Sequence, residues 1–173
     1  MTKFTGKTWL YGDDVSTDSI LPSKWKTSSF DPYELGKHAM SGIDPEFSSK
    51  VSAGDFIVGG LNFGCGSSRE QAPLALTGCG VKIIIAKSIA RIFFRNCINI
   101  GLYPVEVDYP DNYFSQGGEV EVDFDSSTIT NLVSGEKIDF RPIPEFLSKL
   151  VNAGGLKQFL LGGGTLSELV SAK

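Results

Sequence analysis

The fold is decided by residues 55–86, which read DFIVGGLNFGCGSSREQAPLALTGCGVKIIIA. Residues 55–59 and 81–86 are short runs rich in isoleucine and valine, as expected of strands that are buried on both faces. Between them, residues 68–77 fit a helix that is ended by nearby glycines. A strand, a helix and a second strand in this order predict a βαβ unit with parallel strands.

Shorter elements are expected before this unit. Residues 8–11 read as a strand, whereas residues 15–29 have no sustained hydrophobic period and are predicted to form a long loop. Residues 31–40 fit a helix whose start is well marked, because Asp31 is a favourable N-cap and Pro32 suits the first helical position.

After the unit, the hydrophobic pattern predicts a helix at residues 89–98 and a short strand near residues 104–107. Apolar and polar residues then alternate over residues 118–138, which predicts a small antiparallel meander. Two terminal helices are expected at residues 143–151 and 156–161. The whole pattern is typical of an α/β fold with a mixed parallel and antiparallel sheet.

Composition and charge narrow the class of protein. Of the 173 residues, 41% are hydrophobic and 21% are charged, which is ordinary for one globular domain. The formal charge of −4 argues against a nucleic-acid partner, because such proteins normally have a clustered basic surface. No apolar run is long enough to span a membrane, and the first residues lack the apolar core of a secretory signal, so a cytoplasmic location is expected.

The cysteines exclude several kinds of site. Cys65, Cys79 and Cys97 are widely spaced and form no C-x-x-C pair, which suits a reducing compartment better than a disulfide framework. With a single histidine in the chain, they are also too few to build a zinc or iron–sulfur site alone. Any metal would have to come from a partner.

Residues 64–70, Gly-Cys-Gly-Ser-Ser-Arg-Glu, are the candidate functional loop. Glycines let the backbone pass close to a ligand, and Ser67 or Ser68 could cap the following helix. The free N–H groups of the first helical turn would then favour a carboxylate or an alkoxide. The plain alternative is a helix start without a ligand, but Arg69 would oppose the helix dipole there, which favours a bound anion.

Three motifs together resemble a known family. Residues 62–70 read NFGCGSSRE, residues 12–18 read GDDVSTD and residues 90–96 read ARIFFRN. Together, and in their order along the chain, they are similar to the small-subunit family of 3-isopropylmalate dehydratase, the swivel domain of the aconitase family. The resemblance implies a single swivelling β/β/α domain over the whole chain, with a core at about residues 6–161 and a tail at residues 162–173 that frays.

The resemblance also implies an activity and its parts. Members of this family isomerise 2-isopropylmalate and 3-isopropylmalate in leucine biosynthesis by removing water and adding it back. A larger partner subunit carries a [4Fe–4S] cluster, whose free iron acts as a Lewis acid on the substrate hydroxyl. The chain itself would bind no cofactor and no metal. It would supply the opposite wall of a site for a small dicarboxylate or tricarboxylate, with neither nucleic acid nor a membrane as partner.

Residue roles follow from the same resemblance. Ser67 matches the catalytic base that removes a proton from the carbon beside a carboxylate, and Ser68 and Arg69 would hold a substrate carboxylate. Helix-end N–H groups and Arg69 would stabilise the alkoxide form of Ser67. The resemblance adds five residues that line the site: Thr17, Asp18, Gly64, Cys65 and Gly66. The alternative role of Asp18 is to form a turn.

Two departures from the family leave the substrate open. Residues 24–27 read Lys-Trp-Lys-Thr where the family usually has a Tyr-Leu-Arg-Thr-like segment that selects the side group of the substrate. Here Lys26 could hold a distal carboxylate and Trp25 could wall an apolar pocket, with Thr27 beside them, or the lysines are simply exposed. Gln71 replaces a histidine that is typical of leucine-pathway members and is more similar to homoaconitase relatives.

Two alternative functions stay open at this point. One is the small subunit of a related dehydratase for homoaconitate, dimethylmalate or an acid of the citraconate or citramalate type. The other is a non-catalytic swivel module that binds an anion. His38 is expected to pack or to face solvent, and Arg91 and Arg95, one helical turn apart, could clamp an anion or brace loops and the partner interface.

Overall fold

The structure is a computed structural model that describes residues 3–25 and 30–170. Within these residues, one sheet runs through the molecule in the spatial order β4 (Tyr103–Glu106), β3 (Ile83–Ala86), β2 (Phe56–Gly59), β1 (Lys3–Leu10), β5 (Glu119–Asp123), β6 (Thr128–Asn131) and β7 (Lys137–Asp139). Strands β4 to β1 are parallel, and the pairs from β1 through β5 and β6 to β7 are antiparallel. The predicted α/β class with a mixed sheet is confirmed.

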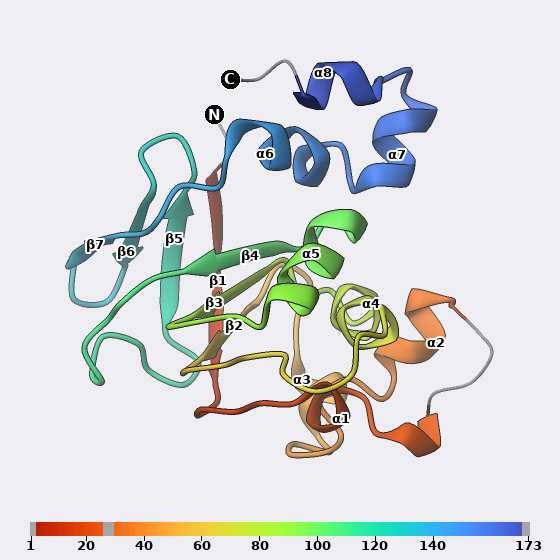
Figure 1. Ribbon diagram of the computed structural model, residues 1–173. Coiled ribbons are helices and arrows are strands. Elements are labelled where there is room, and N and C mark those ends of the chain that lie inside the picture. The colour runs from red at the N-terminus through yellow and green to blue at the C-terminus, as the bar shows by residue number, and fades with distance from the viewer. Residues whose placement is uncertain (1–2, 26–29, 171–173) are drawn as a thin grey trace.

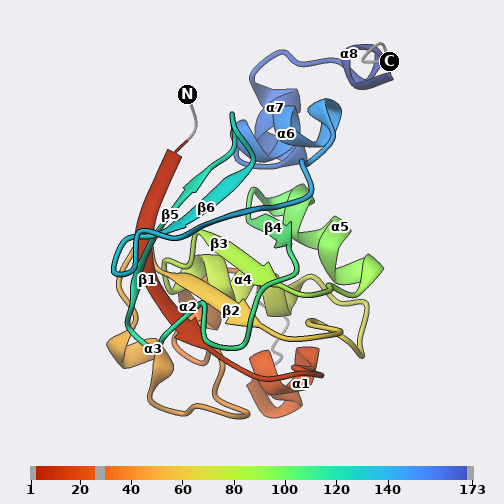
Figure 2. The ribbon, with the colours of Figure 1, turned by 90° about the vertical axis from the view of Figure 1, so that its left-hand side faces the viewer.

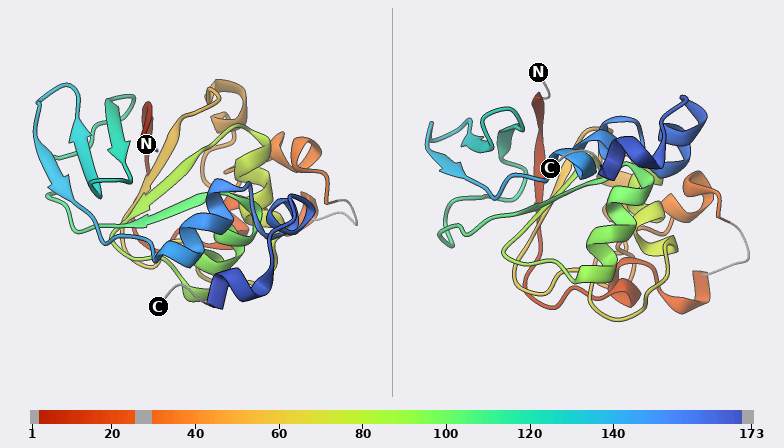
Figure 3. Two further views of the ribbon diagram at one scale, coloured as in Figure 1. Left: turned by 90° about the horizontal axis from the view of Figure 1, so that it is seen from above. Right: turned by 45° about the horizontal axis from the view of Figure 1, so that its top comes forward.

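Helices surround this sheet. They are α1 (Thr17–Ile20), the 3-10 turn η1 (Ser23–Trp25), α2 (Pro32–Gly36), α3 (Phe47–Lys50), α4 (Gln71–Gly78), α5 (Arg91–Ile100), α6 (Glu145–Asn152), α7 (Leu156–Leu161) and α8 (Leu166–Val170). Figure 1 and Figure 2 show α6 to α8 at the end of the molecule opposite α1 and α3, with α4 and α5 between them. Seen from above in Figure 3, the antiparallel strands lie on one side and α2 and α4 on the other.

The βαβ unit predicted from residues 55–86 is confirmed as β2, α4 and β3. Every residue of both strands is buried, because side chains on the two faces of the sheet enter two different hydrophobic cores. Ile57 and Ile84 lie in the first core with residues of α1 to α5. Phe56 and Ile83 lie in the second, which α6 closes with Leu150 and Val151.

Strand β1 is longer than the predicted strand at residues 8–11, because its two halves have different partners. Residues 3–7 pair with β5, and residues 8–10 pair with β2. The first half of β1 therefore depends on a segment that is distant in sequence, which local patterns do not reveal. The meander predicted over residues 118–138 is confirmed as β5 to β7.

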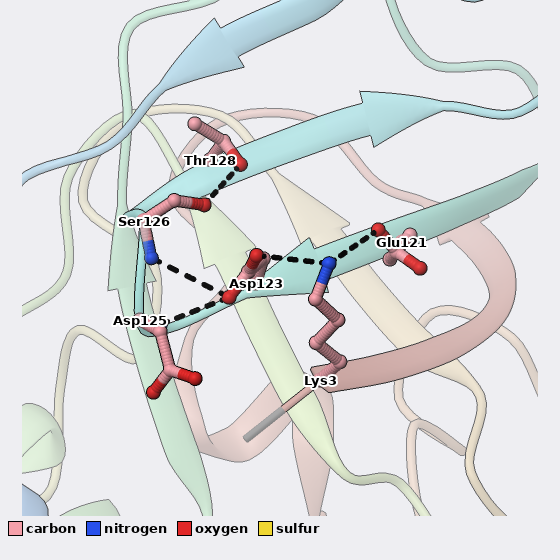
Figure 4. A network of polar contacts seen from close by, with 6 residues as sticks. All are labelled: Lys3, Glu121, Asp123, Asp125, Ser126 and Thr128. Carbon is pink, nitrogen blue, oxygen red and sulfur yellow. Dashed lines mark hydrogen bonds and ion pairs between the residues drawn. The ribbon is translucent and has the colours of Figure 1, made fainter. Parts of the chain in front are cut away.

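A polar network fixes the start of β1 against β5 (Figure 4). Lys3 Nζ lies 3.0 Å from Asp123 Oδ2 and 3.5 Å from Glu121 Oε1. The backbone N–H groups of Asp125 and Ser126 donate to Asp123 Oδ1 at 3.0 and 3.4 Å. The hydrogen bond from Lys3, helped by those from the turn, lowers the pKa of the Asp123 carboxyl to about 2.

The predicted helices at residues 89–98, 143–151 and 156–161 are confirmed as α5, α6 and α7, and the strand near residues 104–107 is confirmed as β4. Three short helices were not predicted. Helix α1 lies inside the expected loop, α3 precedes β2, and α8 lies inside the expected tail. Each has only four or five residues, which is too few for a hydrophobic period to show.

The helix predicted at residues 31–40 begins as expected but ends early. Asp31 caps it by accepting a hydrogen bond from Tyr33 N at 3.0 Å. It stops at Gly36, where a Cβ would lie 2.5 Å from the carbonyl carbon of Gly78, and the chain continues in turns. Met40 has a positive φ of 59°, so it cannot continue a right-handed helix.

Candidate functional site

Residues 60–70, which contain the candidate loop, leave the carboxyl end of β2 between the segments that follow β1 and β3. It is fastened to both by parallel backbone bridges, Ser16 with Cys65 and Phe63 with Ile89. Thr17 N donates to Cys65 O at 2.8 Å on one side. The carboxyl ends of parallel strands are the usual place for ligand sites in α/β folds.

Polar side chains lock the first part of the loop. Asp13 Oδ1 accepts a hydrogen bond from Leu61 N at 2.7 Å, and Asp14 Oδ1 accepts one from Asn62 Nδ2 at 2.7 Å. Asp14 and Asn62 both have positive φ angles, 54° and 58°, which their residue types tolerate better than most. The glycine-rich motif is therefore held by carboxylates of the motif at residues 12–18.

Gly64 is required by a close approach. Its φ is +77°, and a Cβ there would lie 2.2 Å from the ring of Phe93 in α5. Phe93 itself packs edge-on against Phe63, with ring centroids 5.8 Å apart. Gly66 also has a positive φ, +103°, so both positions favour glycine for reasons of backbone conformation, and their role in lining a ligand site stays a prediction.

The predicted capping of α4 by Ser67 or Ser68 is wrong. The helix begins at Gln71, and its N-cap residue Glu70 makes no side-chain capping hydrogen bond. Capping signals are short and also suit an ordered loop, and here the loop backbone is held by distant partners instead. Arg69 therefore precedes the helix, and its charge does not oppose the helix dipole within the first turn.

Two side chains from other elements hold the serine pair. Thr17 Oγ1 accepts a hydrogen bond from Ser67 N at 2.9 Å, and Asn96 Nδ2 of α5 donates to Ser68 O at 3.0 Å. Arg69 N points back to Ser67 Oγ at 3.4 Å. Thr17 is buried, with 1% of its surface exposed, whereas Ser67 is half-buried and Ser68 and Arg69 are exposed. The loop thus has a fixed backbone and side chains that a ligand can reach.

Of the remaining predicted residues, Asp18 and Cys65 are among the described residues, and two others are not. Asp18 lies in α1 next to Thr17, and its Oδ1 accepts a hydrogen bond from Ser23 Oγ at 3.1 Å. Cys65 is half-buried, with its thiol 3.7 Å from Asp14 O. Cys65 is thus part of the loop and is bridged to Ser16, whereas Asp18 comes directly after the residue that contacts the loop, Thr17. Lys26 and Thr27 lie outside the described residues.

Trp25 contacts His38, the single histidine of the chain. Its ring stacks on His38 with centroids 3.7 Å apart and an angle of 3° between the planes. Lys24 Nζ lies 5.3 Å from the Trp25 ring. His38 follows α2 in a turn rather than sitting inside a helix, and its expected packing role is confirmed.

Sequence reasoning missed Asn96 as a residue of this site. It lies in the ARIFFRN motif, whose polar residues fit an exposed helix surface. The sequence therefore gave no reason to place Asn96 in the site. Its contact with Ser68 depends on how α5 packs beside the loop. The available signal was the motif itself, which was used only for the resemblance.

No group of three His, Cys, Asp or Glu side chains in residues 3–25 and 30–170 is placed to hold a metal ion. Burial raises the pKa of the Cys79 thiol to about 11 and raises that of Cys97 well above its usual range. Both thiols are therefore protonated at neutral pH and are poor ligands. None of the described helices is both long and apolar enough to cross a membrane.

Comparison with known proteins identifies the family. Residues 16–110 match the family described as the aconitase C-terminal domain. A 3-isopropylmalate dehydratase small subunit of Thermodesulfovibrio yellowstonii is 49% identical over 157 residues, which cover 91% of this chain and 93% of the relative. A 2,3-dimethylmalate dehydratase small subunit of Eubacterium barkeri is also 49% identical, covering 91% of this chain and 96% of the relative.

A solved structure agrees with these relatives. The crystal structure of 3-isopropylmalate dehydratase from Methanocaldococcus jannaschii superposes with a TM-score of 0.88 at 42% identity, covering 94% of this chain and 95% of that chain. The same fold, the matched segment around the candidate loop and the high identity over nearly the whole chain lead to one conclusion: this chain belongs to the 3-isopropylmalate dehydratase small-subunit family, with the swivel fold of the aconitase C-terminal domain.

Proposed function

We propose that the chain is the small subunit of a hydro-lyase that interconverts 2-isopropylmalate and 3-isopropylmalate by dehydration and rehydration. The observation that carries this proposal is the loop of Ser67, Ser68 and Arg69, whose backbone is fixed by Thr17 and Asn96 while its side chains stay accessible. A preorganised loop of this kind suits a reaction in which a carbon-bound proton must be taken up at a defined place.

In this proposal Ser67 Oγ takes the proton from the substrate carbon beside a carboxylate. A neutral hydroxyl is a weak base, so the alkoxide must be stabilised. The support expected from the helix end is replaced by the Arg69 backbone N–H, which points to Ser67 Oγ at 3.4 Å, and by the positive charge of the Arg69 side chain. When water adds back, Ser67 Oγ gives a proton to the adjacent carbon, which had lost the hydroxyl, and hydroxide adds to the carbon that had lost the proton.

Arg69 and Ser68 are proposed to bind a substrate carboxylate. Both are exposed, and within the described residues no carboxylate pairs with the Arg69 guanidinium. A guanidinium without a partner offers paired, charge-assisted hydrogen bonds to a planar carboxylate. Thr17, Asp18, Gly64, Cys65 and Gly66 would form the surrounding wall.

The proposal requires a large partner subunit, as the small-subunit names of the relatives suggest. When bound on that partner, a [4Fe–4S] cluster would supply Lewis-acid assistance to the departing hydroxyl. No group of three metal-binding side chains lies together in residues 3–25 and 30–170, so the cluster ligands are assigned to the partner. We expect the complex in the cytoplasm, where separate free cysteines stay reduced.

The test is reconstitution with the large subunit. Ser67→Ala should lower turnover of 2-isopropylmalate by at least ~10²-fold, the lower range for loss of a general base, while the subunits still associate. Ser126→Ala, in the turn after β5, is the matched control and should retain full turnover. Turnover is followed by the absorbance of the unsaturated intermediate, and association by gel filtration. Full activity of Ser67→Ala would remove Ser67 from the mechanism.

The relative from Eubacterium barkeri gives a specific reason to test a second substrate, because its name is that of a 2,3-dimethylmalate dehydratase subunit at the same identity of 49%. The reconstituted complex should therefore be assayed with isopropylmalate, dimethylmalate, citramalate and homoaconitate in parallel. We expect the highest kcat/KM for isopropylmalate, because most of the relatives at 46–49% identity are named 3-isopropylmalate dehydratase small subunits. A preference for dimethylmalate would assign the related dehydratase, and turnover of none would leave an anion-binding module.

A further inference from the structure

A hollow lies between α5, β4 and the segment of residues 141–147 that leads into α6. Its volume is about 540 Å³. Apolar side chains make up most of its wall, among them Phe94 of α5 and Phe146 of α6. Phe146 is 38% exposed, so part of its ring is open to a ligand. Hollows of this size and apolar character are typical of small-molecule sites.

The charge of this hollow differs from that of the whole molecule. The chain has four arginines, and three of them, Arg91, Arg95 and Arg141, line it. Arg91 and Arg95 are one turn apart on α5, and Arg141 lines the same hollow from the segment that leads into α6. In a chain of formal charge −4, this is a local concentration of cations.

These guanidinium groups have no partner among the described residues, because none of the side-chain hydrogen bonds or ion pairs there uses them. Glu106 is the single acidic residue of the wall, and its Oε1 accepts a hydrogen bond from Ile89 N at 2.8 Å. One carboxylate oriented toward the backbone cannot balance three arginines. The hollow therefore has an excess of positive charge beside an apolar surface.

We propose that this hollow binds a small amphipathic carboxylate. Its carboxylate is held by Arg91, Arg95 and Arg141, and its apolar body lies against Phe94 and Phe146. The arginines favour an anion, while the aromatic wall favours a ligand with an apolar body over a simple inorganic ion. This site does not depend on the proposed hydro-lyase function, and its test needs no turnover.

The test uses the full chain and a fluorescent probe, 8-anilinonaphthalene-1-sulfonate, with N-phenyl-1-naphthylamine as the uncharged analogue. In the triple variant Arg91→Gln, Arg95→Gln, Arg141→Gln, affinity for the sulfonate should fall by about tenfold or more, because three cationic contacts are lost. Affinity for the uncharged analogue should stay within about twofold. Phe146→Ala should weaken both probes.

Two controls locate the effect. Arg69→Gln changes the fourth arginine, which lies in the candidate loop, and should leave affinity for the sulfonate probe unchanged. Octanoate should displace the sulfonate probe from the unaltered chain, whereas octanamide, which has the same apolar body without the charge, should not. Circular dichroism of the triple variant confirms that the fold is retained.

Two results would overturn the proposal. If the triple variant binds the sulfonate probe as tightly as the unaltered chain, the arginines do not form an anion site. If instead the large subunit displaces the probe and the triple variant associates with that subunit at least tenfold more weakly, the hollow is an interface for an acidic protein segment. Displacement by octanoate that is unaffected by the large subunit supports the carboxylate site.

Discussion

Ser67 depends on a residue that is fifty positions away in the sequence. Its backbone N–H donates to Thr17 Oγ1, and Thr17 is buried at the start of α1. A hydroxyl that accepts a hydrogen bond inside the protein is hard to replace, because the donor would then lack a partner. Thr17 is therefore a positioning residue for the loop rather than only a member of its wall.

Replacing Thr17 by Val tests this role, because the change keeps the shape and removes the acceptor. We expect the free energy of unfolding to fall by about 1 kcal/mol, the usual cost of one such hydrogen bond. Turnover of the reconstituted complex should fall further, by about tenfold to a hundredfold, because Ser67 is displaced from its place. Urea unfolding and steady-state kinetics measure the two effects.

Thr17→Ser is the matched control, since it retains the hydroxyl and should recover most of the activity. If Thr17→Val lost stability but kept normal kcat and KM, the hydrogen bond would serve the fold alone. Such a result would separate the structure of the loop from its proposed chemistry.

At the scale of single residues, the sequence was sufficient to find the loop but not the contacts that hold it. Gly64 and Gly66 were predicted to let the backbone pass close to a ligand; their positive φ angles explain why glycine suits both positions, and the approach to a ligand stays a prediction. The contact from Asn96 could not be predicted, because it joins α5 to Ser68 through tertiary packing. The roles assigned to Ser67 and Trp25 stay predictions.

At the scale of elements, α5 connects the two sites. Asn96 donates a hydrogen bond to the candidate loop, while its neighbour Arg95 lines the hollow between α5, β4 and residues 141–147. The helix ends at Ile100. Its C-cap residue, Gly101, has the left-handed φ of 81° that is common at a helix C-terminus. A defined end and a buried face hold α5 at a fixed place between the two sites.

Asn96→Ala should weaken substrate binding more than it slows the chemical step. Without the hydrogen bond, the Ser68 carbonyl lacks this partner, and the backbone that carries the Ser68 side chain is held less firmly. We expect KM to rise by about tenfold, with kcat reduced by less than about threefold, the pattern for loss of uniform binding. Steady-state kinetics of the reconstituted complex measure both constants.

Asn99→Ala on the same helix is the control for Asn96→Ala, since Asn99 is exposed and lies near the helix end. It should leave KM unchanged. A fall in kcat alone for Asn96→Ala would contradict a binding role and would place Asn96 in the orientation of the reacting groups.

The elements that the sequence predicted correctly are those with a strong local pattern. The isoleucine-rich strand β3 and the amphipathic helices α5 and α6 belong to this group. The start of α4 was mistaken, because a Ser-Ser-Arg-Glu sequence fits both a helix cap and a loop. Only the distant hydrogen bonds to the loop decide between these two structures.

At the scale of the whole molecule, β1 joins the parallel and antiparallel halves of the sheet. Lys3 and Asp123 pair at the outer end of this junction. The pKa of the Asp123 carboxyl is about 2 in the folded protein, below the value of about 4 for an unfolded chain. The ionised carboxyl therefore favours the folded state at neutral pH, and this contribution is lost as the pH falls from about 4 to about 2.

Asp123→Asn should consequently lower the melting temperature at pH 7 and have a progressively smaller effect as the pH falls toward 2. Thermal unfolding at several pH values measures this difference. Lys3→Met removes the other partner, so the Asp123→Asn change should matter less in that background. An effect of Asp123→Asn that is independent of pH would show that the ion pair contributes nothing to stability.

The division of β1 between two partners also has a consequence for the order of folding during synthesis. Residues 8–10 can pair with β2 once residue 58 has left the ribosome, but residues 3–7 must wait for β5. At a synthesis rate of roughly 5–20 residues per second, the wait is on the order of ten seconds. During this time the first strand of the nascent chain has an unpaired edge, and the second core stays open until the chain reaches α6.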